Sequence, residues 1–142
     1  MQLLAIVGFF AATSMAAQVT IHNKCSTAVW LKPDSAGATG TPIPIPTKSA
    51  WITPLTGTGN AFKLSSSSTS LDKPIQFDYS VGADGLVYYD VTYDNNGGKG
   101  APFSLLAHGD GCPEVVCPAG PDVCKAVKSC GGGRDLHVYA CP

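Results

Sequence analysis

The sequence predicts an all-β protein, an antiparallel β-sandwich stapled by disulfides, with a short cysteine-rich loop region. Several stretches alternate apolar and polar side chains with a period of two, which is typical of half-buried strands. Gly 16 and Pro 11 in 142 residues supply turns between those stretches. Long helices are disfavoured, because the chain has one Glu and fills the positions between apolar residues with Ser, Thr, Gly and Pro.

Length and charge restrict the class of protein. A chain of 142 residues is long enough for one domain but short for two, and no internal repeat is visible. The net charge of -1 does not provide the basic surface that duplex DNA requires, so we expect no nucleic-acid partner. Because 44% of the residues are hydrophobic, the chain is not expected to be disordered.

The first segment, residues 1–17, is predicted to be a signal peptide. An apolar run covers residues 3–12, and small residues suited to signal-peptidase cleavage follow up to Ala17. A buried core segment is the alternative. The run is shorter than the ~20 residues that span a bilayer, so no membrane partner is expected. These features predict a secreted protein, extracellular or associated with a cell wall, with a single domain over residues 18–142.

The expected strands follow the chain in order. Alternation is clearest over residues 75–80, 86–94 and 136–140, and shorter candidates are residues 18–22, 28–32, 49–53, 61–64 and 103–107. Asp84-Gly85 lies between two alternating stretches and predicts a hairpin. Three prolines in residues 41–46 exclude a central strand and predict an extended edge or loop. Residues 112–130 are expected to hold little regular structure.

The cysteines indicate disulfides. All six lie after the predicted cleavage site: Cys25, Cys112, Cys117, Cys124, Cys130 and Cys141. In an oxidising compartment an even number predicts three disulfides, although six cysteines allow many pairings. The alternative is a zinc site made by the four cysteines between positions 112 and 130. Their spacing contains no C-x2-C pair of the kind found in zinc knuckles, so we expect no metal ion and no cofactor.

Four segments resemble the thaumatin-like proteins. Residues 17–30 (AQVTIHNKCSTAVW) are similar to the family's first strand, and residues 87–105 (VYYDVTYDNNGGKGAPFSL) to a central segment. Residues 111–117 (GCPEVVC) keep a C-x4-C step, and residues 130–142 (CGGGRDLHVYACP) resemble the closing strand. Within this family, the chain resembles the small fungal group related to the Blastomyces yeast-phase-specific and CetA-like proteins. The resemblance implies a sandwich of thaumatin-like type.

The resemblance also implies a disulfide pairing. In the family the first and last cysteines are joined, which here are Cys25 and Cys141, and a second bond joins Cys112 to Cys130. Cys117 and Cys124 remain, and we predict that they pair with each other. In the chain-entropy model the long loop closed by Cys25 and Cys141 contributes ~4–5 kcal/mol, and this bond ties both ends of the domain to one sheet.

The resemblance further points to a sugar-binding face. Larger family members have an acidic cleft lined by an Arg, a Glu and several Asp, and some bind or slowly hydrolyse β-1,3-glucan. Two of those Asp positions correspond here to Asp90 and Asp94. We expect a face on which Tyr88 is a stacking platform beside Asp78, Asp90 and Asp94. The alternative is an ordinary solvated face of a sheet.

Other features of the cleft are missing from this chain. The Glu position falls near Gln76, where an amide replaces the acid, and no Arg precedes Arg134. Hydrolysis takes two carboxyls about 5–5.5 Å apart for retention or about 6.5–9.5 Å apart for inversion. Asp90 and Asp94 on one regular strand would lie ~13 Å apart, which is too far. No catalytic residue is therefore assigned.

These observations predict a secreted, monomeric, non-catalytic binding protein that acts at a cell wall or host surface and recognises β-glucan. The first alternative is a weak endo-β-1,3-glucanase, in which Asp90 is the candidate acid or electrostatic stabiliser. The second is a secreted effector or antigen that binds a protein partner, for which we expect a contiguous exposed apolar patch.

The remaining residues with chemical potential give weaker signals. His22, His108 and His137 are scattered along the sequence, and each is interpreted as a surface or hydrogen-bonded histidine. Trp30 and Trp51 lie within apolar strands and are predicted to belong to the core.

Overall fold

The computed structural model describes residues 16–71, 74–93, 102–120, 124 and 127–142, and within these ranges every regular element is a strand. The strands are β1 (Gln18–Asn23), β2 (Val29–Ser35), β3 (Ala38–Thr39), β4 (Ile43–Ile45), β5 (Ala50–Pro54), β6 (Asn60–Ser65), β7 (Ile75–Val81), β8 (Leu86–Tyr93), β9 (Leu105–Gly109), β10 (Val115–Cys117), β11 (Lys128–Gly131) and β12 (Leu136–Ala140). The expected all-β class is therefore confirmed.

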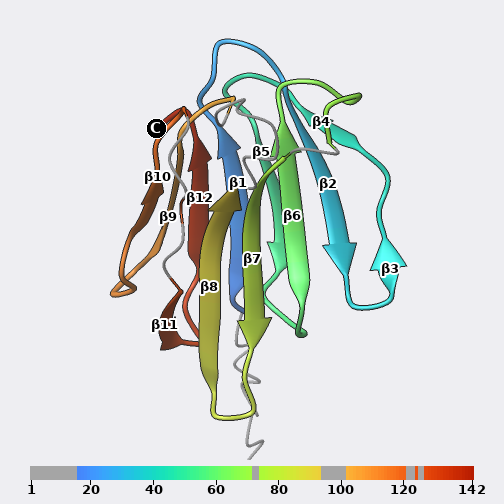
Figure 1. Cartoon of the computed structure of the whole chain (residues 1–142). Helices are drawn as coiled ribbons and strands as arrows, with labels where there is room; N and C mark the ends of the chain where they lie inside the picture. The colour runs from blue at the N-terminus through green and yellow to red at the C-terminus, as the bar shows by residue number, and fades with distance from the viewer. Residues whose placement is uncertain (1–15, 72–73, 94–101, 121–123, 125–126) are drawn as a thin grey trace, which may run out of the picture.

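The strands form two sheets that pack face to face (Figure 1). One is five-stranded, with the order β10-β9-β12-β1-β5. The other is seven-stranded and runs β11-β8-β7-β6-β2-β3, with β4 also paired to β2. Every pair is antiparallel except β1 with β12, which lie side by side and parallel in the middle of the five-stranded sheet.

The core lies between the sheets because each strand turns alternate side chains inward. In β7 and β8 the inward positions include Phe77 and Tyr89, which are almost completely buried. Trp51 of β5 meets Phe62 of β6 edge to face, with ring centroids 5.2 Å apart, so this contact joins one sheet to the other. Burying a side chain of the size of Phe77 contributes about 1.5–3 kcal/mol of hydrophobic stabilisation.

The predicted hairpin is present between β7 and β8. Gly85 has a φ of 78°, a conformation that suits glycine, and its amide donates to the Gly82 carbonyl at 3.1 Å. The Gly82 amide in turn donates to the Leu86 carbonyl at 2.8 Å. The turn fixes the register of β7 against β8, on which the candidate site depends.

Two disulfides are those that the family resemblance implied, and the third is the one predicted for the two remaining cysteines. Disulfides join Cys25 to Cys141, Cys112 to Cys130 and Cys117 to Cys124. The first of these bonds links the residues that follow β1 and β12, so it closes the chain at the parallel strand pair.

Two expectations from the sequence need correction. The cysteine-rich region carries more regular structure than predicted, because β10 pairs with β9 and β11 extends the seven-stranded sheet beside β8. Trp30 was expected in the core, but it alternates with the buried Val29 and Leu31 and therefore points to the outer face of β2. The proline-rich segment does form an edge, since among the described strands the short strand β4 pairs with β2 alone.

The predicted signal peptide falls outside the described residues, apart from Ala16 and Ala17. Within the described part of the chain, no helix has the length and apolar character needed to cross a membrane.

The three disulfides should differ in their contribution to stability. Cys25 and Cys141 are 116 positions apart and Cys117 and Cys124 are 7 apart. Replacing Cys25 and Cys141 together by Ala is expected to lower the free energy of unfolding by about 5 kcal/mol, against about 2 kcal/mol for the Cys117 and Cys124 pair, because a longer loop restricts the unfolded chain more. Urea unfolding of the two double variants measures the difference. Equal losses would contradict the expectation.

Candidate functional site

The outer face of β7 and β8 brings together two of the predicted site residues. Asp78 and Asp90 alternate with buried neighbours, so both carboxylates point away from the core. The register places Asp78 directly opposite Asp90. Side chains directly opposite each other in an antiparallel pair have Cβ atoms about 4.5–5.5 Å apart, so the two carboxyl groups are close neighbours.

Neighbouring side chains hold the Asp78 carboxylate in place. The Gln76 side-chain amide donates to Asp78 Oδ1 at 2.6 Å, and the Thr92 hydroxyl donates to Oδ2 at 3.1 Å. Burial raises the pKa of Asp78 above its ordinary value, and the facing Asp90 adds to the increase. The two hydrogen bonds and the charge of Lys63 act in the opposite direction but do not cancel it. Asp78 is therefore a fixed carboxyl that takes up a proton more readily than an ordinary Asp.

Tyr88 lies at the edge of the same face, near the hairpin. Its side chain is 39% exposed. The Tyr88 hydroxyl donates to Asp84 Oδ2 at 2.6 Å, while the Leu86 amide donates to Asp84 Oδ1 at 3.0 Å. The Tyr88 hydroxyl holds the pKa of Asp84 below its usual range. The aromatic ring is thus anchored at its tip, which reduces the entropy lost when a ligand packs against it.

A shallow hollow of about 230 Å³ joins these side chains into one site. Its lining residues are Gly59, Asn60, Asp78, Tyr79, Ser80, Tyr88, Tyr89, Asp90 and Val127. Val127 lies just before β11 and is 68% exposed, so it adds an apolar wall. We call this hollow, together with the side chains around it, the polar face.

A charged pair on β2 and β6 extends the polar face. Lys63 stands opposite Gln76 on the neighbouring strand, and its Nζ lies 2.7 Å from Asp34 Oδ2. This ion pair is not predicted by any pattern in the sequence. Strand alternation alone places Lys63 and Asp34 on the outer face, but their contact depends on the pairing of β2 with β6.

Three of the four predicted binding residues, Asp78, Tyr88 and Asp90, therefore line one hollow. Asp94 lies outside the described residues. From the sequence we compared Asp90 with Asp94 on the same strand to judge whether two carboxyls lie close together. In the structure the carboxyl that faces Asp90 belongs to Asp78 on the adjacent strand. The predicted hairpin already implies that Asp78 faces Asp90, because the two residues are equally distant from Asp84 in the sequence.

The Asp78 carboxylate is expected to destabilise the fold at neutral pH. Its pKa is higher in the folded chain than in the unfolded chain, so the penalty is absent below about pH 3.9 and grows as the pH rises through the folded-state value. Asp78→Asn should therefore raise the unfolding midpoint at pH 7 relative to the unmodified chain, with the gain disappearing near pH 3. The Gln76 bond can persist, and the Thr92 hydroxyl can rotate to accept from the new amide.

Asp84→Asn is the matched control, because the pKa of Asp84 is lowered and its carboxylate favours the folded state at neutral pH. This variant should lose stability at pH 7 more than at pH 3. Thermal unfolding across this pH range measures both effects. The same pH response in both variants would show that the environment of Asp78 has been misassigned.

Solved structures share this fold. One is the crystal structure of the protein elicitor MoHrip2 from Magnaporthe oryzae, with a TM-score of 0.70 and 22% identity, covering 89% of this chain and 100% of that chain. Another is the thaumatin-like xylanase inhibitor TLXI, with a TM-score of 0.63 and 22% identity, covering 87% of this chain and 99% of that chain. These matches confirm the thaumatin-like sandwich that the sequence resemblance implied.

The family comparison covers nearly the whole sequence. No curated protein sequence matches the chain. The model of the Blastomyces yeast-phase-specific protein matches residues 6–142, which include every described strand and all six cysteines. The chain therefore belongs to the Blastomyces yeast-phase-specific protein family.

Proposed function

We propose that this protein is a secreted, non-catalytic binding protein that recognises β-glucan through the polar face. The observation that carries the proposal is the anchored, exposed ring of Tyr88 beside the Asp78 and Asp90 carboxylates in one hollow. A sugar ring presents C–H groups on its faces and hydroxyls around its edge. An aromatic ring packs against the C–H groups, and carboxylates accept hydrogen bonds from the hydroxyls.

Secretion is part of the proposal. The apolar segment at residues 3–12 has the length of a signal-peptide core, and small residues follow it. Three disulfides persist in an oxidising environment such as the cell exterior. Both features support a protein that acts outside the cell, at a cell wall or at the surface of a host.

Binding without hydrolysis is favoured by the state of Asp78. Both oxygens of its carboxyl accept hydrogen bonds from the protein, one from Gln76 on the same strand and one from Thr92 on β8, so the group is fixed on the sheet. The hollow is also shallow and lies on one sheet. A substrate could rest on such a face without being enclosed, whereas catalysis gains from exclusion of water.

A weak endo-β-1,3-glucanase is the second candidate, because Asp78 and Asp90 form a close carboxyl pair. Cβ atoms of directly opposite residues lie about 4.5–5.5 Å apart, which is compatible with the carboxyl separation of about 5–5.5 Å in retaining glycosidases. The raised pKa of Asp78 suits a proton donor, which would leave Asp90 to stabilise the developing positive charge. This alternative predicts sugar release in addition to binding.

A protein partner is the third candidate. One structural neighbour is a protein elicitor and another a xylanase inhibitor. On the outer face of the five-stranded sheet, Val116 of β10 is 60% exposed and Ile52 of β5 is 57% exposed. These strands are the two edges of the sheet, so a partner would have to cover its whole width to bury both side chains.

Co-sedimentation with insoluble β-1,3-glucan tests the proposal, with cellulose and chitin as parallel polymers. The oxidised protein should pellet selectively with β-1,3-glucan. Tyr88→Ala and Asp90→Asn should each weaken binding about tenfold, which corresponds to about 1.4 kcal/mol, because each removes one contact without opening the core. Val116→Thr alters an exposed residue of the other sheet and should bind like the unmodified protein.

The other possible results of this experiment distinguish among the three candidate functions. Selective pelleting that is unchanged by Tyr88→Ala and Asp90→Asn would contradict the polar face as the site. Release of reducing sugar that disappears in Asp78→Asn would replace the binding function by the glucanase. Failure to pellet with any polymer would reject both carbohydrate functions for these substrates and favour a protein partner.

A further inference from the structure

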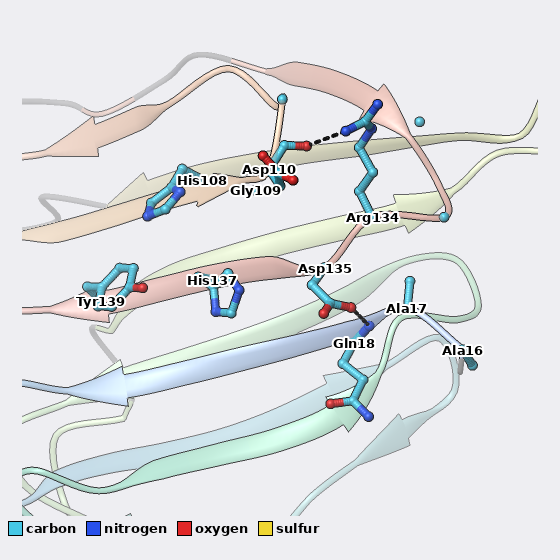
Figure 2. A pocket seen from close by; sticks show the side chains of 13 residues that line it. Ala16, Ala17, Gln18, His108, Gly109, Asp110, Arg134, Asp135, His137 and Tyr139 are labelled. Carbon is cyan, nitrogen blue, oxygen red and sulfur yellow. Dashed lines mark hydrogen bonds between the residues drawn. The ribbon is translucent and has the colours of Figure 1, made fainter. Parts of the chain in front are cut away.

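The outer face of the five-stranded sheet gathers the three histidines that are scattered in the sequence. The parallel pairing sets His22 of β1 opposite Tyr139 of β12, and the antiparallel pairing sets His137 of β12 opposite His108 of β9. Figure 2 shows the side chain of His108 on one strand and those of His137 and Tyr139 on the neighbouring strand, and all three residues line one hollow. Four rings from three strands therefore share one face.

The rings pack against one another in an ordered way. Tyr139 stacks with His22 at a centroid distance of 4.5 Å and an interplanar angle of 9°. It also stacks with His108 at 5.4 Å and 13°. Stacking against Tyr139 limits the rotation of both histidine rings, so the positions of their nitrogens are restricted before a ligand binds.

Two imidazole nitrogens are close enough to share an ion. His22 Nε2 and His137 Nδ1 are 3.2 Å apart and share a hydrogen bond, in which the tautomer decides which nitrogen donates. In a complex with metal–nitrogen bonds of about 2.0–2.1 Å, two ligands of a tetrahedral ion lie about 3.4 Å apart and two adjacent ligands at a right angle lie about 2.9 Å apart. The observed distance falls between these values. A bound ion would replace this hydrogen bond: the donor ring carries its proton on its other nitrogen, and small rotations of the two rings direct both lone pairs toward one point.

We propose that His22 and His137 form a binding site for a late first-row divalent metal ion such as Cu²⁺, Ni²⁺ or Zn²⁺. Water supplies the remaining ligands. Among the described residues, no group of three or more His, Cys, Asp or Glu is arranged to hold an ion, so the protein contributes two nitrogens. The ring of His108 is 6.1 Å from that of His137 between centroids, and it flanks the site without being a ligand.

Each of the two histidines lines a hollow that is open to solvent. His137 lines an open hollow of about 1040 Å³ that also contains Asp110 and Asp135, and His22 lines a second hollow of about 460 Å³. The Lys24 ammonium lies over the Tyr139 ring, 4.9 Å from its centroid. This neighbouring positive charge opposes a bound cation, so Lys24→Ala should bind the ion more tightly. The site is on the opposite sheet from the polar face and does not depend on the proposed function.

Isothermal titration calorimetry on the full oxidised chain, without a histidine tag and after removal of metals with EDTA, tests this site. We expect one ion per chain, with Cu²⁺ binding more tightly than Ni²⁺ or Zn²⁺. His22→Gln and His137→Gln should each weaken binding at least tenfold. His108→Gln is the matched control from the same face and should change the affinity less than threefold.

A second measurement avoids the variants. Substoichiometric Cu²⁺ should broaden the imidazole NMR signals of His22 and His137 in the unmodified chain before those of His108. Absence of saturable binding, or affinity that survives both His22→Gln and His137→Gln, would overturn the proposal. An equal loss in His108→Gln would overturn the two-histidine geometry.

Discussion

The parallel pairing of β1 with β12 is the contact on which the rest of the structure depends. It joins the first and last strands in the middle of the five-stranded sheet, where Ile21 and Val138 are completely buried. The Cys25–Cys141 disulfide locks this pair just beyond its end. Asn23 supports the same corner, since its buried amide donates to the Thr27 and Ile45 carbonyls and its side-chain oxygen accepts from the Cys25 amide.

The pairing of β1 with β12 affects both faces of the five-stranded sheet. The inner face of the five-stranded sheet completes the core, and the seven-stranded sheet packs against this core. The outer face of the seven-stranded sheet therefore carries Asp78, Tyr88 and Asp90 on a rigid support. The outer face of the five-stranded sheet carries His22 and His137 on the two strands that meet. Functional side chains placed on strands of this kind are held more precisely than side chains on loops.

Local patterns predicted much of this structure from the sequence. Alternation identified the long strands, and Asp84-Gly85 identified the β7–β8 hairpin, because both depend on neighbouring residues. The family resemblance added the long-range Cys25–Cys141 and Cys112–Cys130 bonds, but contacts encoded neither by a local pattern nor by the resemblance were missed. The His22–His137 contact joins residues 115 positions apart. The strand β11 is defined by its hydrogen-bonded pairing with β8, which is distant in the sequence. The pairing of Asp78 with Asp90 lies between the local patterns and the long-range contacts. The register of the hairpin determines this pairing once the turn is placed at the right residues.

The proposed function requires the polar face, and not the five-stranded sheet, to bind β-glucan. Titration of the ¹⁵N-labelled protein with a soluble β-1,3-gluco-oligosaccharide, followed by backbone amide NMR, tests it most directly. We expect saturable shifts at Asp78, Ser80, Tyr88 and Asp90, with the amides of β1 and β12 unaffected. Shifts confined to the five-stranded sheet, or no shifts at saturating oligosaccharide, would contradict the proposed function.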